Sequence, residues 1–151
     1  MSLPVDFDTA TARHGFPMLV AGQAQKEFFV NEALARIDAL LHPAFETVAN
    51  TPPAVPAAGE CWLVGPAPLG AWEGHADALA FWDGVQWSFC APVDGMQMFD
   101  RAEGQWIVFR SGWRRATRPQ PPTGGSTIDV EARTAIGAII DAIATLSIIR
   151  N

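Results

Sequence analysis

Short aromatic-rich runs, separated by turns that contain glycine, occupy residues 60–115. Asp83-Gly84 stands between two of these runs, and Asp-Gly in that position is a strong signal for a β-hairpin. Asp94-Gly95 and Glu103-Gly104 mark two further turns. Five short strands joined by short turns predict an antiparallel β-meander that curls into a small barrel. The predicted strands are residues 60–64, 78–82, 85–90, 96–100 and 105–110.

Two segments rich in proline and glycine flank this predicted β domain. Residues 49–59 contain three prolines, and proline cannot donate to the ladder of a central strand, so this segment is expected to be an extended linker. Residues 116–125 form the second linker. An N-terminal arm and helix is expected at 1–48 and a C-terminal helix at 126–151. The predicted fold class is therefore α+β, with one helix before the β domain and one after it.

The first helix is predicted at residues 22–42 from the helical spacing of its apolar side chains. Pro43 ends it, because the residue before a proline is pushed out of the α region. Glu32 and Arg36 stand four residues apart, in the order that supports a helix. The apolar stripe consists of Val30, Leu34, Ile37 and Leu41, widened by Phe29, Ala33 and Leu40.

The second helix is predicted at residues 126–147, with the capping-box pattern Ser126-Thr127-Ile128-Asp129 at its start. An isolated helix of about 20 residues is marginal in water, so its apolar face needs a partner. Packing on the chain's own β domain and packing on sister copies both remain open. Isoleucine at both core positions of a heptad favours more than two strands, and this favours a homotrimer. The predicted interface residues step by four, three, four and three: Ala132, Ile136, Ile139, Ile143 and Leu146.

Composition and charge exclude several classes of protein. A chain that is 49% hydrophobic and 17% charged is too apolar to be disordered. Its net charge of −6 argues against binding to nucleic acid. The sequence has no run of about 18 apolar residues, so we expect no insertion into a membrane.

The N-terminus and the cysteines indicate a compartment. The acidic start Met1–Asp8 lacks the basic region of a secretion signal. Cys61 and Cys90 are too few for a disulfide framework and are expected to be buried thiols, although a single bridge between them stays open. We therefore expect the chain to be made in the cytoplasm and to leave it only within a larger particle.

Residues that could carry catalysis or bind metal are scattered. His14, His42 and His75 lie in different segments without the spacing of a metal site. We accordingly expect no metal, no cofactor and no enzymatic activity. A small glycan hydrolase that uses Glu73 or Asp77 is the remaining enzymatic alternative, since two carboxylates suffice for that reaction.

Six tryptophans lie within residues 62–113. Trp72 falls in a loop and Trp113 at a strand end, where an exposed indole suits stacking on a sugar ring or contact between subunits. A free-standing carbohydrate-binding module is therefore a further alternative. Trp82 and Trp87 flank the Asp-Gly turn and are expected to pair across it. The expected core tryptophans are Trp62, Trp82, Trp87 and Trp106.

Several motifs, in their order and spacing over roughly residues 14–113, resemble a domain of phage and prophage proteins. Similar proteins belong to the tail fibres and head spikes of bacteriophages and of phage-like gene transfer agents. The motifs are Trp62-Leu63-Val64-Gly65, Gly70-Ala71-Trp72-Glu73-Gly74-His75, Ala80-Phe81-Trp82-Asp83-Gly84, Trp87-Ser88-Phe89, Pro92-Val93-Asp94-Gly95 and the upstream Val20-Ala21-Gly22-Gln23-Ala24-Gln25-Lys26-Glu27.

The resemblance implies a structural part of a virion, made in the bacterial cytoplasm and assembled with other virion proteins. Contact with the host's surface polysaccharide is the open part of that implication. Within the Gly-Ala-Trp-x-Gly-His stretch, Gly70 and Gly74 permit backbone geometry that is closed to other residues. His75 is expected to bond a backbone group and to order this loop.

Overall fold

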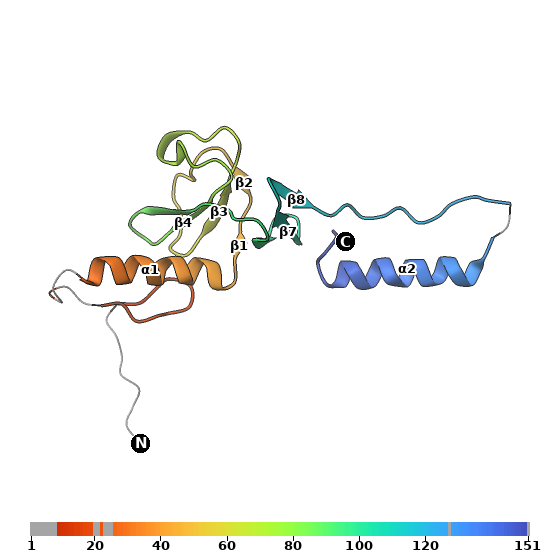
Figure 1. The fold of residues 1–151 in the computed structure, drawn as a ribbon, viewed down its shortest axis with the longest axis horizontal. Coiled ribbons are helices and arrows are strands. Elements are labelled where there is room, and N and C mark those ends of the chain that lie inside the picture. Colours follow the sequence, from red (N-terminus) through yellow and green to blue (C-terminus); the bar gives the residue numbers. More distant parts are fainter. Residues whose placement is uncertain (1–8, 20–21, 23–25, 127, 151) are drawn as a thin grey trace, which may run out of the picture. The chain divides into compact units, whose positions relative to one another are not determined.

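The computed structural model describes residues 9–19, 22, 26–126 and 128–150. The chain divides into two compact units, Met1–Pro92 and Val93–Asn151 (Figure 1). Their boundary falls at a proline, which cannot donate a hydrogen bond to a strand ladder. The region predicted as one β domain, 60–115, is thus shared between the two units.

The first unit contains one helix and one four-stranded sheet. The sheet has the order β2-β3-β4-β5, in which β2 is parallel to β3 and the other pairs are antiparallel. A short 3-10 helix, η1, stands between β3 and β4. The elements are α1 (Lys26–Leu41), β1 (Ala44–Phe45), β2 (Val48–Ala49), β3 (Cys61–Val64), η1 (Gly70–Trp72), β4 (Leu79–Trp82) and β5 (Trp87–Cys90).

The hairpin between β4 and β5 forms as predicted. Trp82 pairs with Trp87, and the centroids of their rings lie 5.2 Å apart. The Oδ1 atom of Asp83 accepts the backbone N–H groups of Val85 and Gln86, each at 2.8 Å. The carboxylate therefore closes the turn that brings the two tryptophans together.

The second unit contains a three-stranded antiparallel sheet and one helix. The strands β6 (Gln97–Asp100), β7 (Gln105–Phe109) and β8 (Trp113–Arg115) follow one another in the sheet, and α2 spans Val130–Thr145. The sequence did not predict β8. One side of this sheet is buried, and it includes two polar side chains with partners. Arg115 forms an ion pair with Asp100, and the Nε2 atom of Gln105 donates to the carbonyl oxygen of Ala116 at 2.9 Å.

The predicted α+β class is confirmed, and all five predicted strands are present within one or two residues of their expected ends. The predicted barrel is wrong. The strands of the described chain lie in two sheets, neither of which closes into a barrel, because the meander is interrupted at Pro92. Each helix has 16 residues, and neither has the length and apolar character that a membrane span requires.

The start of α2 differs from its prediction. The helix begins at Val130, and its N-cap is Asp129, whose Oδ1 atom accepts the N–H of Ala132 at 2.8 Å. Ser126 lies before the helix, and Thr127 of the predicted capping box lies outside the described residues.

We expect Asp129→Ala to destabilise the first turn of α2 by about 1 kcal/mol, because it removes an N-cap acceptor. Amide hydrogen exchange at Ala132 should become faster by the corresponding factor. Ser126→Ala is the matched control and should leave this exchange rate unchanged. Equal effects of the two substitutions would contradict the assignment of Asp129 as the cap.

Candidate functional site

Trp72 lies in the core of the first unit. Its side chain is 0% exposed and packs among Val64, Ala80 and the partly buried Trp62 and Trp87. The Trp72 and Trp87 rings meet edge to face, with centroids 5.2 Å apart. The expectation that Trp72 offers an exposed face to a sugar is therefore wrong. The residue comes from η1, which turns its indole inward although the segment around it is a loop.

The loop that carries Trp72 depends on two glycines. Gly70 has φ +61° and Gly74 has φ +82°, values that side-chain-bearing residues rarely adopt. A Cβ atom at either position would meet nothing within 4 Å, so backbone conformation, and not space, requires glycine there. The backbone N–H of His75 donates to the carbonyl of Trp72 at 3.1 Å, and the His75 ring stacks on Phe89 with centroids 3.7 Å apart. This loop thus has a packing role.

The other tryptophans divide differently from the prediction. Trp62, Trp82 and Trp87 are half-buried against the first unit. Trp106 was expected in the core but is 41% exposed on the second unit. Trp113 is half-buried, with its ring edge to face with Phe109 at 5.2 Å.

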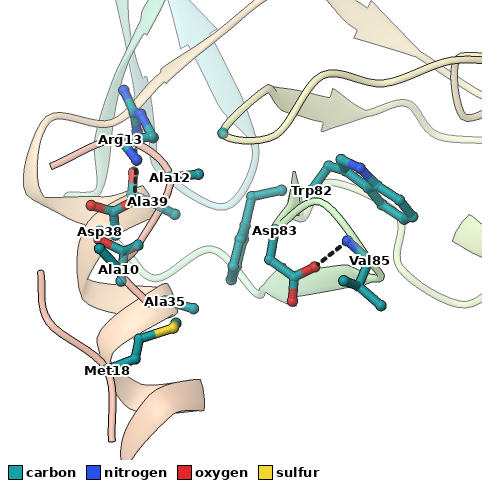
Figure 2. A pocket seen from close by; sticks show the side chains of 13 residues that line it. Ala10, Ala12, Arg13, Met18, Ala35, Asp38, Ala39, Trp82, Asp83 and Val85 are labelled. Carbon is teal, nitrogen blue, oxygen red and sulfur yellow. Dashed lines mark hydrogen bonds between the residues drawn. The ribbon is translucent and has the colours of Figure 1, made fainter. Parts of the chain in front are cut away.

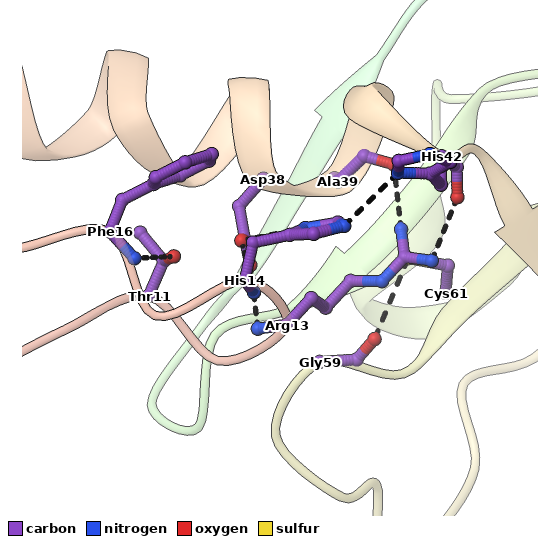
Figure 3. Close-up of polar contacts among 9 residues, drawn as sticks. All are labelled: Thr11, Arg13, His14, Phe16, Asp38, Ala39, His42, Gly59 and Cys61. Atoms are coloured by element: carbon purple, nitrogen blue, oxygen red, sulfur yellow. Dashed lines mark hydrogen bonds and ion pairs between the residues drawn. The ribbon is translucent and has the colours of Figure 1, made fainter.

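A buried carboxylate fastens the N-terminal segment to α1. Asp38 accepts the backbone N–H groups of Arg13 and His14, both at 2.7 Å (Figure 3). Arg13 donates through its guanidinium to the carbonyl oxygens of Ala39 and His42, both at 2.8 Å. These carbonyls belong to the end of α1, where backbone acceptors have no partner within the helix. The segment and the helix end thus satisfy each other's polar groups.

Burial alone would raise the pKa of Asp38, because desolvation disfavours the charged carboxylate. The hydrogen bonds from the backbone of Arg13 and His14, and from the side chains of Thr11 and His14, act in the opposite direction. Together they outweigh desolvation, and the pKa of Asp38 lies below its ordinary value of 3.8. Asp38 is therefore ionised in the folded protein at neutral pH.

Two histidines that are far apart in sequence meet beside this carboxylate. The Nδ1 atom of His14 lies 3.1 Å from Asp38 Oδ1, and its Nε2 atom lies 3.2 Å from Nδ1 of His42. An Asp–His pair orients an imidazole in the same way as in a catalytic triad. Here the second ring nitrogen of His14 faces another imidazole instead of a hydroxyl or thiol nucleophile. We interpret the arrangement as structural.

A pocket of about 200 Å³ lies next to this network, between the N-terminal segment, α1 and the turn after β4 (Figure 2). Eight of its thirteen lining residues are apolar, including Ala12 and Ala35. The carboxylates that reach it, Asp38 and Asp83, already accept the backbone hydrogen bonds described above. The pocket therefore has little polar capacity left with which to bind or activate a substrate.

Other residues with reactive side chains are placed apart. Cys61 and Cys90 are not joined by a disulfide. Burial raises the pKa of the Cys90 thiol, with a smaller opposing effect of the Arg36 guanidinium, so this thiol is a poor nucleophile at neutral pH. Glu73 and Asp77 are exposed on the loop that follows η1. Among the described residues, no group of three His, Cys, Asp or Glu side chains is placed to hold a metal ion.

Helix α1 packs through its polar and small residues. Its buried side chains are Asp38 and Ala39, and Asn31 on the same side exchanges two hydrogen bonds with the backbone of Leu19. Most of the apolar stripe predicted from the sequence points away from this packed side, and its member Leu34 is half-buried. Phe29 is 74% exposed, and the other exposed members are Val30, Ala33, Ile37, Leu40 and Leu41.

Helix α2 shows the same arrangement. Its buried residues are Ile140 and Ala144, which form a small cluster with Ile149. The predicted interface residues lie roughly a third of a turn away from this side. Ile139 is 59% exposed and Leu146 is 66% exposed. The remaining members are the exposed Ala132 and Ile136 and the half-buried Ile143.

The second linker runs alongside α2 (Figure 1), and arginine side chains join the two. Arg118 pairs with Asp141 at 3.1 Å, and Arg133 donates to the carbonyls of Pro122 and Gly124. The segment therefore runs antiparallel to the helix and is not a free spacer. Apart from the half-buried Ile143, the predicted interface face remains exposed, which makes it the strongest candidate for a functional surface.

Comparison with known proteins gives one match. The sequence model of a family described as "Protein of unknown function (DUF2793)" matches residues 30–114. The matched region contains the strand motifs, the loop that carries Trp72 and most of α1. Neither the curated proteins nor the solved structures provide a match.

Asp38→Asn should lower the free energy of unfolding by about 2 kcal/mol at pH 7, because it removes a charged acceptor of several hydrogen bonds. The pKa of Asp38 is lower in the folded state than in the unfolded state, so its contribution is present above pH 4 and is lost as the pH falls through the folded pKa. Urea unfolding of both proteins between pH 7 and pH 2 should show their difference shrinking below about pH 4. Glu32→Gln, which removes an exposed ion pair with Arg36, should change stability by less than about 0.5 kcal/mol. A difference that grows in acid would contradict this role of Asp38.

Proposed function

The chain belongs to the DUF2793 family, whose function is unknown, and we propose that it is a self-associating structural component of a phage-like particle. The proposed working form is a homotrimer held by α2, with other virion proteins as its further partners. The observation that carries this proposal is the uncovered apolar face of α2.

That face carries no charge. The three positions per heptad that point outward between residues 132 and 146 are all alanine, isoleucine or leucine. The charged residues of the helix, Glu131, Arg133 and Asp141, lie on its other sides. A contiguous exposed apolar surface is typical of a contact with another protein or with a membrane. The heptad spacing favours another helix as that contact.

The width of the face supports a bundle of more than two helices. A two-stranded coiled coil uses two apolar positions per heptad, whereas α2 also presents Ala135 and Ala142 beside its isoleucines. These alanines allow a neighbouring helix to approach closely. Isoleucine occupies both core positions in Ile136, Ile139 and Ile143, a pattern that shifts coiled coils from dimers towards trimers and tetramers.

The exposed stripe of α1 supports the same proposal from the other unit. Its outward residues Val30, Ala33, Ile37 and Leu40 step by three, four and three. A chain with two uncovered apolar helix faces suits an assembled particle better than a freely diffusing enzyme. The assignment to a phage-like particle comes from the motif resemblance described above.

We expect the protein to elute with three times the 16.2 kDa mass of one chain in light scattering coupled to size exclusion. Ile139→Lys should convert this species to monomer, because it places a charge in the centre of the apolar face. Thr134→Lys adds the same charge on the opposite, exposed side of the helix and should leave the trimer intact. A wild-type protein that is monomeric at micromolar concentrations would contradict the proposal.

A further inference from the structure

We propose that the self-association surface extends beyond α2 into a groove on the second unit, and that this groove receives α2 of a second copy of the chain. This inference rests on the proposed trimer. The groove has a volume of about 420 Å³ and lies between the outer face of the β6–β7–β8 sheet and the end of α2. Its floor includes Trp106 and Val108, and its side includes Leu146 and Ile148.

Strand register explains why these residues share one face. Phe99 pairs with Trp106, and Val108 pairs with both Gln97 and Arg114, so all five side chains point to the same side of the sheet. The opposite side carries the buried residues Met98 and Ile107, together with the buried polar pair Asp100 and Gln105. The exposed aromatic and aliphatic side chains therefore form one surface and are not scattered singly.

The groove is preformed. The backbone N–H of Trp106 donates to the carbonyl oxygen of Ser147 at 2.8 Å, and Gln105 Nε2 donates to the carbonyl oxygen of Ile148 at 3.3 Å. These bonds hold the residues after α2 against β7. The Trp106 ring also meets Phe99 edge to face, with centroids 5.4 Å apart. A partner would bind this surface without a large cost of ordering it.

Leu146 makes the groove continuous with the apolar face of α2. It is the last residue of that face and also lines the groove. The apolar face of α2 between residues 132 and 146 has seven side chains, three of them alanines, whereas a standard interface uses roughly 20–30 residues on each partner. A stable interface buries about 800 Å² on each partner. The helix face alone is therefore too small, and the adjoining groove is the nearest apolar surface that enlarges it.

The lining favours an apolar helix over a sugar. Six of the eight lining residues are apolar, and the polar ones are Gln97 and Arg114. A sugar ring presents hydroxyl groups on most of its edge, and these two side chains satisfy few of them. The alanine and isoleucine face of a second α2 needs no such partners. Trp106, which is 41% exposed, is the large aromatic residue at the centre of this contact, a role in which tryptophan is enriched.

The test is the association constant of Trp106→Lys, measured by sedimentation equilibrium on the full chain. We expect at least about tenfold weaker association than for the wild type, the size of effect typical of a central interface tryptophan. Trp106→Phe, which keeps an aromatic ring, should associate almost as strongly as the wild type. Val93→Lys adds the same charge at an exposed apolar residue of the same unit outside the groove, and should associate like the wild type.

A photo-cross-linking residue at position 148 gives a measurement that does not depend on the lysine variant folding. In a mixture of unlabelled and 15N-labelled chains, which distinguishes adducts between two copies from adducts within one, this residue should cross-link to α2 of a second copy. The same photo-cross-linking residue at position 93 should not.

The outcomes separate the two proposals. If Trp106→Lys associates like the wild type while Ile139→Lys is monomeric, the proposed role of the groove is contradicted and the proposed trimer is supported. The proposed role of the groove is also contradicted if Trp106→Lys abolishes binding to host polysaccharide and leaves self-association unchanged. A monomeric wild type would overturn both.

Discussion

The carboxylate of Asp38 determines which side of α1 faces the rest of its unit. It accepts the backbone N–H groups of Arg13 and His14, and these bonds hold an irregular segment against the polar side of the helix. With that side covered, the apolar stripe is left outside. In α2, Arg133 and Asp141 bind the linker segment between Arg118 and Gly124, and these bonds determine which side of the helix is packed. In both units, charged side chains that bind an extended segment decide the orientation of a helix.

This arrangement explains why hydrophobic periodicity predicted the helices but not their packing. Apolar spacing shows which residues share a face, and it placed both helices correctly to within about four residues. It does not show which face points inward. That choice depends on hydrogen bonds between Asp38 and residues 24 and 25 positions earlier, which leave no local pattern in the sequence. The meeting of His14 and His42 was unpredictable for the same reason.

The β-strands were predictable because their signals are local. Asp83-Gly84 determines a turn and thereby the pairing of Trp82 with Trp87. Barrel closure and the division at Pro92 depend on contacts between strands that are distant in sequence, and no local sequence pattern predicts such contacts. The prediction that Trp72 stacks on a sugar was wrong because the backbone conformations of Gly70 and Gly74 direct the Trp72 side chain into the core. Trp106 was predicted in the core and is exposed, since alternation along β7 does not reveal which side of the sheet is covered.

The candidate site that emerges is a surface and not a cleft. The polar groups around the pocket of the first unit are occupied by backbone hydrogen bonds, whereas most of the apolar stripes of α1 and α2 are exposed. Family membership adds no activity to this picture. The scaffold role within a particle is our proposal, and the exposed apolar surfaces are the observation behind it.

The lack of charge on the outward face of α2 has a consequence for how an assembly would behave. Contacts without ion pairs are indifferent to screening by simple salts, because there is no Coulomb attraction to weaken. Hydrophobic association instead loses strength on cooling and gains it in the presence of strongly hydrated anions such as sulfate. A particle joined through this face would not come apart when simple salt is added, and it would loosen most readily in the cold.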